Sequence, residues 1–331
     1  RPIIVVTGAN NGIGFGICRR LLYQLSLSSP TDALPLFDRT NASNAGILYP
    51  CEGVTLVMAC RSIDRAKAAR AKLFELFEKD VSRSKLHRNQ RRVANFKQNI
   101  EIDIHRLDLA SVQSVLDCCN KLGRTYPYIS HVICNAGVAP FVRINWLLLL
   151  KQSLASPLDA LTYPKYNVQE TGKMSNDGLG WVWQCNVFGH YILARTLEPM
   201  LAASATGETG PGRVIWQSSL EALPEYFDPD DWQLVKTVDP YHASKYHMDL
   251  IGAELNRRAL QDRPQKIRHI LVEPGVVHTS IDLMLINTFL HHLKHISFWL
   301  ARFIGSKHHN ISAWNGAAAA VHAALVSFAF L

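Results

Sequence analysis

The chain has 331 residues, of which 48% are hydrophobic, so it can bury a sizeable core in one large α/β unit or in two smaller ones. Its formal net charge of +8 favours an anionic partner, such as a phosphorylated cofactor or an acidic lipid surface, but it is too dispersed to indicate nucleic acid. The seven Cys form no Cys-x-x-Cys pair and show no ligand spacing with His, which argues against a metal site and predicts free buried thiols in a reducing compartment.

The ends of the chain carry little information. No signal peptide is visible, and the sequence begins at Arg1 without a Met, so we expect both ends to be trimmed. One dense basic run, residues 83–92, is interpreted either as a solvated loop or as a contact for lipid headgroups.

Strand and helix patterns alternate along the chain. Apolar runs typical of buried strands occur at residues 3–6, 54–59, 101–107, 130–134, 213–218 and 267–273. Helical patterns occur at about 12–25, 63–79, 111–123, 178–203 and 241–261, with a terminal helix near 311–328. This order predicts an α/β fold over residues 1–331, a Rossmann-type doubly wound parallel sheet with helices on both faces. Right-handed crossovers place the loops after the strands along one edge, where ligands bind.

Three stretches interrupt this order. Residues 26–53 are rich in turn-forming residues and predict a long surface loop. Residues 138–177 are too irregular for a sheet strand and too long for an idle connection. Residues 276–308 contain apolar residues at helical spacing, which predicts either a helix folded on the domain or an interfacial helix that covers an apolar substrate pocket. No apolar run approaches the roughly 18 residues that a membrane span needs.

A glycine-rich turn follows the first predicted strand and precedes a helical pattern. Its residues are Thr7, Gly8, Ala9, Asn10, Asn11, Gly12, Ile13 and Gly14. Glycines allow close approach of the backbone to a pyrophosphate, and the amides at the start of a helix bind it. The strand–turn–helix order therefore predicts a dinucleotide site.

Further cofactor contacts are predicted after the other strands. Arg61 stands where an acidic residue would bind the ribose of NAD, which favours NADPH, and Ser62 beside it is a second candidate contact. The alternative is a surface Arg beside a helix that Ser62 caps. Asp108 either accepts a hydrogen bond from adenine or is a turn residue. Two further groups complete the predicted site. The small residues after the fourth strand are Asn135, Ala136 and Gly137, and the residues after the sixth strand, on the nicotinamide side, are Pro274, Gly275, Val277 and Thr279.

Tyr241 and Lys245 predict acid catalysis at a carbonyl group. Positions four apart share one face of a helix, so the ammonium can lie near the phenol and lower its pKa; the alternative is an exposed helix pair. Ser219 follows the fifth strand and can hydrogen-bond the substrate carbonyl, with Ser218 as its competitor. Asn186 lies in a predicted helix, where Asn is unfavourable, so a packing or functional role is expected.

These motifs, in this order, resemble those of the short-chain dehydrogenase/reductase family over essentially the whole chain. The resemblance implies that Tyr241 is the acid, that Ser219 orients the carbonyl, and that Lys245 lowers the pKa of the Tyr and binds the nicotinamide ribose. It also implies that Asn186 holds a water of the proton relay. The separation of Ser219 from Tyr241 exceeds the usual spacing, so we expect residues 220–240 to reshape the substrate mouth.

Within this family, the chain resembles the 3-keto-steroid reductases of fungal-type sterol biosynthesis. The resemblance lies in residues 145–146, 157–158, 178–179, 184–189, 300–306 and 309–311. It implies NADPH-dependent reduction of the C3 ketone of a 4-methyl sterol at the endoplasmic reticulum membrane, near other C4-demethylation enzymes. Two alternatives stay open: a reductase of another lipophilic ketone (a retinoid, fatty-acyl ketone or polyketide), and a non-catalytic NADPH-binding member of a membrane assembly.

Overall fold

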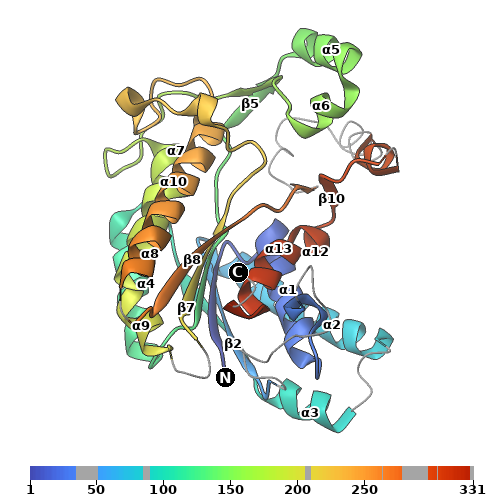
Figure 1. The fold of residues 1–331 in the computed structure, drawn as a ribbon, viewed down its shortest axis with the longest axis vertical. Helices are drawn as coiled ribbons and strands as arrows, with labels where there is room; N and C mark the ends of the chain where they lie inside the picture. Colours follow the sequence, from blue (N-terminus) through green and yellow to red (C-terminus); the bar gives the residue numbers. More distant parts are fainter. Residues whose placement is uncertain are drawn as a thin grey trace.

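Six parallel strands form the central sheet of the computed structural model, which describes residues 1–34, 51–84, 90–205, 210–262, 264–277, 297–303 and 305–328. The strand order is β3-β2-β1-β4-β7-β8 (Figure 1). The bounds are β1 Ile3–Thr7, β2 Val54–Cys60, β3 Ile100–Arg106, β4 His131–Cys134, β7 Gly212–Gln217 and β8 Ile267–Val272. Each strand lies within one residue of its predicted bounds, and the predicted fold class is confirmed.

Helices cover both faces of the sheet (Figure 1). One face carries α1 Gly12–Ser26, α2 Ile63–Arg83, α3 Gln90–Gln98 and α13 Ala318–Leu325; the other carries α4 Val112–Thr125, α8 Gly189–Thr196 and α10 Pro240–Gln261. Alternation along β1 divides the core, because Ile4 and Val6 pack on the first face and Ile3 and Val5 on the second. The order reverses between β1 and β4, and the crevice at that point is where doubly wound sheets bind ligands.

The insertion at residues 138–177 corrects one expectation. It contains two short strands, β5 Phe141–Ile144 and β6 Asn167–Gln169, which pair antiparallel outside the main sheet. Between them lie α5 Trp146–Ala155 and α6 Pro157–Thr162, which project beyond the carboxyl edge of the sheet (Figure 1). Strands of three and four residues are too short to leave an alternating pattern, so the irregular sequence concealed them.

The single helix predicted at 178–203 is divided. The segments are α7 Trp181–Trp183, the π-helical turn η2 Gln184–Phe188, α8, and α9 Glu198–Ala203. Pro199 occupies the first turn of α9 and favours a new helix start there. The π turn contains Asn186, and such single turns occur often at functional sites.

The remaining elements are short. They are η1 Thr31–Ala33, η3 Pro224–Tyr226, η4 Pro229–Asp231, β9 Val276–Val277, β10 His309–Ile311 and α12 Ala313–Gly316. The predicted terminal helix is therefore two helices, α12 and α13. Of the basic run, residues 90–92 begin α3 instead of continuing a loop.

Parts of the predicted loops lie outside the described residues. These are residues 35–50 of the loop 26–53, residues 85–89 of the basic run, and residues 278–296 and 304 of the stretch 276–308. Residues 297–303 of that last stretch are helical. All seven Cys are free and buried, as predicted. Within the described ranges, no helix combines the length and the apolar character required to cross a bilayer.

Candidate active site

A cavity of about 450 Å³ opens at the carboxyl edge of β1, β4 and β7. It brings together residues from the glycine-rich turn, the loops after the fourth, fifth and sixth sheet strands, helix α10 and the 138–177 insertion. Its lining includes Gly8, Asn10, Asn11, Gly12, Ile13, Asn135, Ala136, Gly137, Ser218, Ser219, Tyr241, Lys245, Pro274, Gly275 and Val277. Most of the residues predicted from separate motifs therefore meet in one place.

The glycine-rich turn needs its glycines. Gly8 and Gly12 adopt left-handed φ angles of +66° and +54°, which side chains with a Cβ rarely adopt. A Cβ at Gly14 would lie 2.5 Å from the carbonyl oxygen of Gly8 and from Nδ2 of Asn135. Asn11 caps α1 by accepting a hydrogen bond from the Gly12 amide at 2.8 Å. These constraints bring the start of α1 directly to the cavity.

Thr7 joins the turn to the loop after β4. Its hydroxyl accepts hydrogen bonds from the amides of Asn135 and Ala136, both at 2.9 Å, and Nδ2 of Asn135 donates to the Thr7 carbonyl at 2.9 Å. The small residues predicted after β4 are thereby held against the cavity. The motif alone gives Thr7 no separate role, although Thr7 is its first residue.

The three residues predicted for the adenosine end do not line the cavity. Arg61 is exposed after β2, and Ser62 caps α2 through the Arg65 amide at 3.4 Å. Oδ1 of Asp108 accepts a hydrogen bond from the Ala110 amide at 3.1 Å. Asp108 is therefore a turn residue in this structure, the second of its two predicted roles. Contacts of Arg61 and Asp108 with a cofactor stay predictions.

The loop after β8 closes another side of the cavity. Pro274, Gly275 and Val277 line it, and Gly275 has a φ of +70° that only glycine adopts readily. Thr279 lies outside the described residues.

Ser219, Tyr241 and Lys245 lie together on the cavity wall. The hydroxyl of Ser219 acts on the phenol of Tyr241 and lowers its pKa. Nζ of Lys245 lies 5.9 Å from the centre of the Tyr241 ring and donates to the carbonyl oxygen of Gln217 at 2.8 Å. Tyr241 and Lys245 are thus not an exposed helix pair.

The pKa of Tyr241 departs from expectation. Burial of the phenol and the negative charge of Glu221 raise this pKa, and the Ser219 hydroxyl opposes them only in part. The Lys245 ammonium donates to Gln217, and burial outweighs any effect it has on the phenol, so a lowering of the Tyr241 pKa by Lys245 stays a prediction. Burial also lowers the pKa of Lys245 to about 8, although Asp249 and Cys134 act in the opposite direction.

Asn186 is fully buried, and its side chain fastens the π turn to the neighbouring segments. Nδ2 donates to the Val138 carbonyl and to the Ser244 hydroxyl, both at 2.9 Å, and Oδ1 accepts from the Val138 amide at 2.8 Å. Its backbone oxygen lies 3.1 Å from Nδ1 of His190. These hydrogen bonds explain by packing why an Asn occurs inside this helical segment. A relay water at Asn186 stays a prediction.

The two candidate serines are separated by their partners. Ser219 lowers the pKa of the Tyr241 phenol, whereas Ser218 is buried and lowers the pKa of the Asp249 carboxyl. The geometry favours Ser219 as the group that faces a substrate carbonyl.

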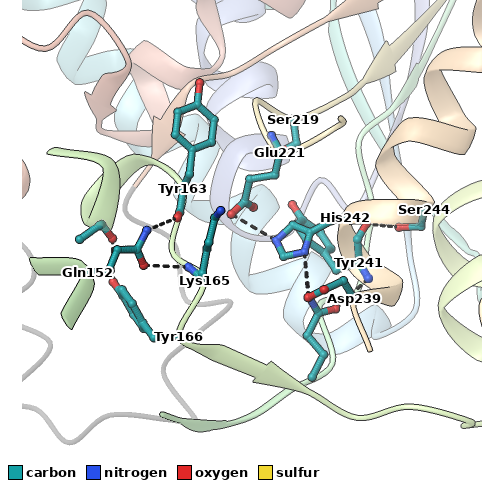
Figure 2. Close-up of polar contacts among 12 residues, drawn as sticks. Gln152, Tyr163, Lys165, Tyr166, Ser219, Glu221, Asp239, Tyr241, His242 and Ser244 are labelled. Carbon is teal, nitrogen blue, oxygen red and sulfur yellow. Dashed lines mark hydrogen bonds and ion pairs between the residues drawn. The ribbon is translucent and has the colours of Figure 1, made fainter. Parts of the chain in front are cut away.

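Several lining residues were missed by sequence reasoning. From the insertion and the C-terminal region they are Leu161, Thr162, Pro164, Tyr166 and Phe298; from the loop after β7 they are Leu220 and Glu221. Gln152 braces the insertion loop, since its side chain donates to the Tyr163 carbonyl at 2.8 Å and accepts from the Lys165 amide at 3.1 Å (Figure 2). The sequence indicated their segments, the insertion 138–177, the loop 220–240 and the stretch 276–308, but not the individual residues.

Comparison with known proteins places this site in a family. No protein-family model matches the chain. The chain is 30% identical to the 3-keto-steroid reductase of Kluyveromyces lactis, over 98% of its own length and 81% of that protein. It is 29% identical to the 3-keto-steroid reductase ERG27 of Candida albicans, with the same two coverages.

Among solved structures, salutaridine reductase from Papaver somniferum shares the fold. Its TM-score is 0.59 at 16% identity, covering 98% of this chain and 96% of that one. Because the Kluyveromyces relative matches nearly the full chain, this protein belongs to the 3-keto-steroid reductase family, on a short-chain dehydrogenase/reductase fold.

Proposed function

We propose that the protein is an NADPH-dependent 3-keto-steroid reductase that converts the C3 ketone of a 4-methyl sterol intermediate into the 3-hydroxyl during sterol biosynthesis. The observation that carries the proposal is the convergence of Ser219, Tyr241 and Lys245 on the cavity that the glycine-rich turn also lines. An acid, a second hydroxyl and a cation beside a dinucleotide site are what carbonyl reduction requires.

The residues of the cavity fit a dinucleotide. A Cβ at Gly14 would collide with Gly8 and Asn135, and Gly8 and Gly12 hold left-handed φ angles, so the backbone at the start of α1 is left open for phosphate groups. Arg61 provides a charge for a 2′-phosphate at the end of β2. When bound, NADPH supplies the hydride that forms the new C–H bond at the carbonyl carbon.

Tyr241 completes the reduction by donating its phenolic proton to the carbonyl oxygen. The O–H bond of the phenol breaks as the O–H bond of the product alcohol forms, and the phenolate then recovers a proton from solvent. Ser219 donates to the same oxygen as its negative charge develops, a contribution of about 3 kcal/mol for one such donor. Lys245 holds a positive charge on the same wall.

The wall of the cavity suits an apolar substrate with one polar end. Leu161, Pro164 and Phe298 supply an apolar surface, and Ser219 and Tyr241 supply two hydroxyl groups. Such a division fits a rigid hydrocarbon skeleton whose ketone alone needs orientation.

A panel of ketones tests the function directly. The purified protein is incubated with NADPH and, in turn, a 4-methyl 3-keto sterol, other 3-keto steroids, a retinal, a fatty-acyl ketone and a polyketide ketone, and loss of NADPH absorbance is followed. We expect the sterol ketone to be preferred. Preference for another ketone would contradict the proposed substrate. Tight NADPH binding with no turnover of any ketone would contradict the proposed reaction.

The substitution Tyr241→Phe tests the assigned acid. It removes one hydroxyl from the cavity, so we expect turnover to fall to the background rate while NADPH fluorescence still reports binding. Retained turnover would exclude Tyr241 as the proton donor.

We also propose that α5 and the helical residues 297–303 rest on a membrane surface from which the sterol enters. No residue of α5 is buried, and Leu147, Leu150 and Leu154 are 64%, 57% and 78% exposed on one side of it. Phe303 is 90% exposed, while Phe298 of the same helical stretch lines the cavity. The insertion likewise lines the cavity through Leu161, so both exposed surfaces lie next to the substrate path.

Flotation with lipid vesicles tests this surface. We expect the protein to float with vesicles of neutral and anionic lipid, and the combined changes Leu147→Ser, Leu150→Ser and Leu154→Ser to reduce the bound fraction. Phe74→Ser is the matched control, because Phe74 is an exposed apolar residue of α2, away from the insertion (Figure 1). Equal binding by the triple variant and the control would contradict the proposal.

We propose that this activity lies at the cytosolic face of the endoplasmic reticulum, near other enzymes of sterol C4 demethylation. The support is the family membership and the exposed apolar surface of α5. Proximity labelling from the tagged protein in cells tests it, with C4-demethylation enzymes as the expected labelled proteins; labelling of unrelated compartments would contradict the location.

A further inference from the structure

Two carboxylates flank a buried imidazole at the cavity wall. Nε2 of His242 lies 3.3 Å from Oε1 of Glu221, and Nδ1 lies 3.4 Å from Oδ1 of Asp239 (Figure 2). We call these three residues the acid–histidine cluster. Glu221 belongs to the loop after β7 and the other two to the start of α10, so the cluster ties this loop to the helix that carries Tyr241.

The position of His242 is fixed on several sides. Its ring stacks on Tyr226 with 4.9 Å between the ring centres, and Nδ1 lies 3.1 Å from Nε2 of Gln169. Gln169 in turn accepts a hydrogen bond from the Tyr241 amide at 2.8 Å through its side-chain oxygen. The imidazole is therefore held by the loop, by β6 and by its own helix.

Glu221 connects this cluster to the reacting groups. It lines the cavity with Ser219 and Tyr241, and its amide donates to the Ser219 hydroxyl at 3.2 Å. The carboxylate is the nearby negative charge that raises the pKa of Tyr241. The bond to His242 sets the direction of that carboxylate (Figure 2).

We propose that Glu221, held by His242, is a positioning residue that keeps the Tyr241 phenol in its protonated form, so that the site remains an acid as the pH rises. The inference rests on the proposed function, in which Tyr241 donates a proton to a ketone. In the reverse reaction, the alcohol O–H gives its proton to the Tyr241 phenolate while NADP⁺ takes the hydride, so this reaction reports the phenolate directly.

The charges around Tyr241 come from few elements. Lys245 and the cluster residues Asp239 and His242 belong to α10 and its start, and Glu221 comes from the loop after β7. The ring of Phe141 contributes an uncharged edge from β5, 5.9 Å from the Tyr241 ring. The positive charges of Lys245 and of protonated His242 favour the phenolate, and the carboxylates of Glu221 and Asp239 oppose it. Removal of the Glu221 charge alone therefore favours the phenolate.

Titration of the phenol in the NADP⁺ complex is the test. Tyrosinate absorbance is followed with pH in the wild-type protein and in Glu221→Gln, and the same titration in the Tyr241→Phe background is subtracted from each. We expect Glu221→Gln to move the Tyr241 transition, and with it the rising pH limb of kcat/KM for 3-hydroxysteroid oxidation, down by roughly one pH unit.

Two controls isolate the charge of Glu221. Glu221→Asp keeps the carboxylate and should restore the transition toward that of the wild type. Glu225→Gln removes an exposed carboxylate of the same loop, which does not line the cavity, and should leave the transition unchanged.

The outcomes separate this inference from the proposed function. A transition that stays in place in Glu221→Gln overturns the role of Glu221, even when the wild-type protein reduces ketones. A raised KM for the steroid with an unmoved transition also overturns it, because Glu221 would then contact the substrate. A shifted transition in a protein that turns over no ketone retains the role of Glu221 and refutes the reductase.

Discussion

The ammonium of Lys245 and the carbonyl oxygen of Gln217 lie 2.8 Å apart, so the last residue of β7 fixes the catalytic cation of α10. Lys245 is only 5% exposed and makes this bond inside the cavity wall. The strand and the helix are thereby held in register at the point where Ser219 and Tyr241 meet.

Replacement of this cation should damage activity more than stability. Lys245→Met keeps a long side chain but removes the charge and its donors, so we expect kcat/KM to fall by about 10²- to 10⁴-fold. The loss of one hydrogen bond is offset by relief of a buried charge, and the free energy of unfolding should change by about 1 kcal/mol or less. Steady-state kinetics and urea unfolding measure both quantities. Lys121→Met, at an exposed position of α4, is the control; equal losses of activity in both variants would contradict the assignment.

The close packing at Gly14 predicts a defect in cofactor binding. In Gly14→Ala, the new methyl group would lie 2.5 Å from the Gly8 carbonyl and from Asn135 Nδ2, so the turn must shift. We expect a destabilisation of about 1–3 kcal/mol and weaker NADPH binding, measured by thermal unfolding and by NADPH fluorescence. Gly123→Ala is the matched control, because its nearest neighbour is Met200 Sδ at 3.9 Å and Ala favours the helix α4. Unchanged NADPH affinity in Gly14→Ala would show that the glycine-rich turn is not part of the cofactor site.

The parts of this architecture that were predictable are those whose signals are local. Each sheet strand is a short apolar run bounded by turns, and the residues at positions 7–14 carry the turn in their own composition. The π turn around Asn186 left no such signal, because one inserted residue hardly changes the helical spacing of apolar side chains. Pro199 is a local signal for a helix start, yet the apolar spacing on both sides of it predicts one continuous helix.

The sequence predicts which residues form the site better than it predicts their charges and burial. The spacing of Tyr241 and Lys245 indicated one helix face, yet it gave no measure of how deeply the phenol is buried or of which acceptor the ammonium chooses. The contact between Glu221 and His242 joins residues 21 positions apart through a loop with two short 3₁₀ turns. Such a contact depends on the folded loop, whose Asp231 carboxylate accepts hydrogen bonds from three backbone amides.

The charge of Arg61 predicts a preference for NADPH over NADH. Arg61 is exposed at the end of β2, on the side of the glycine-rich turn, and a guanidinium there pairs with a 2′-phosphate. In Arg61→Ala we expect the ratio of kcat/KM for NADPH to that for NADH to fall about 10- to 100-fold, as the loss of one to two charge-assisted hydrogen bonds implies. Arg124→Ala is the control, because Arg124 lies in the last turn of α4, and this variant should keep the wild-type ratio. A ratio unchanged by Arg61→Ala would assign the 2′-phosphate to another residue.

The acid–histidine cluster predicts a stability that depends on pH. Burial alone would lower the pKa of His242, but hydrogen bonds and charges from Asp239 and Glu221 raise it to about 9 from an ordinary value of 6.5. A raised folded-state pKa means that the imidazolium stabilises the protein fully below pH 6.5 and that this contribution disappears as the pH rises through about 9. The shift corresponds to at most about 3 kcal/mol. Urea unfolding of the wild-type protein and of His242→Gln at pH 6 and pH 10 measures it, and the variant should lose most at the lower pH. An equal difference at both pH values would show that His242 contributes through packing on Tyr226 and not through its charge.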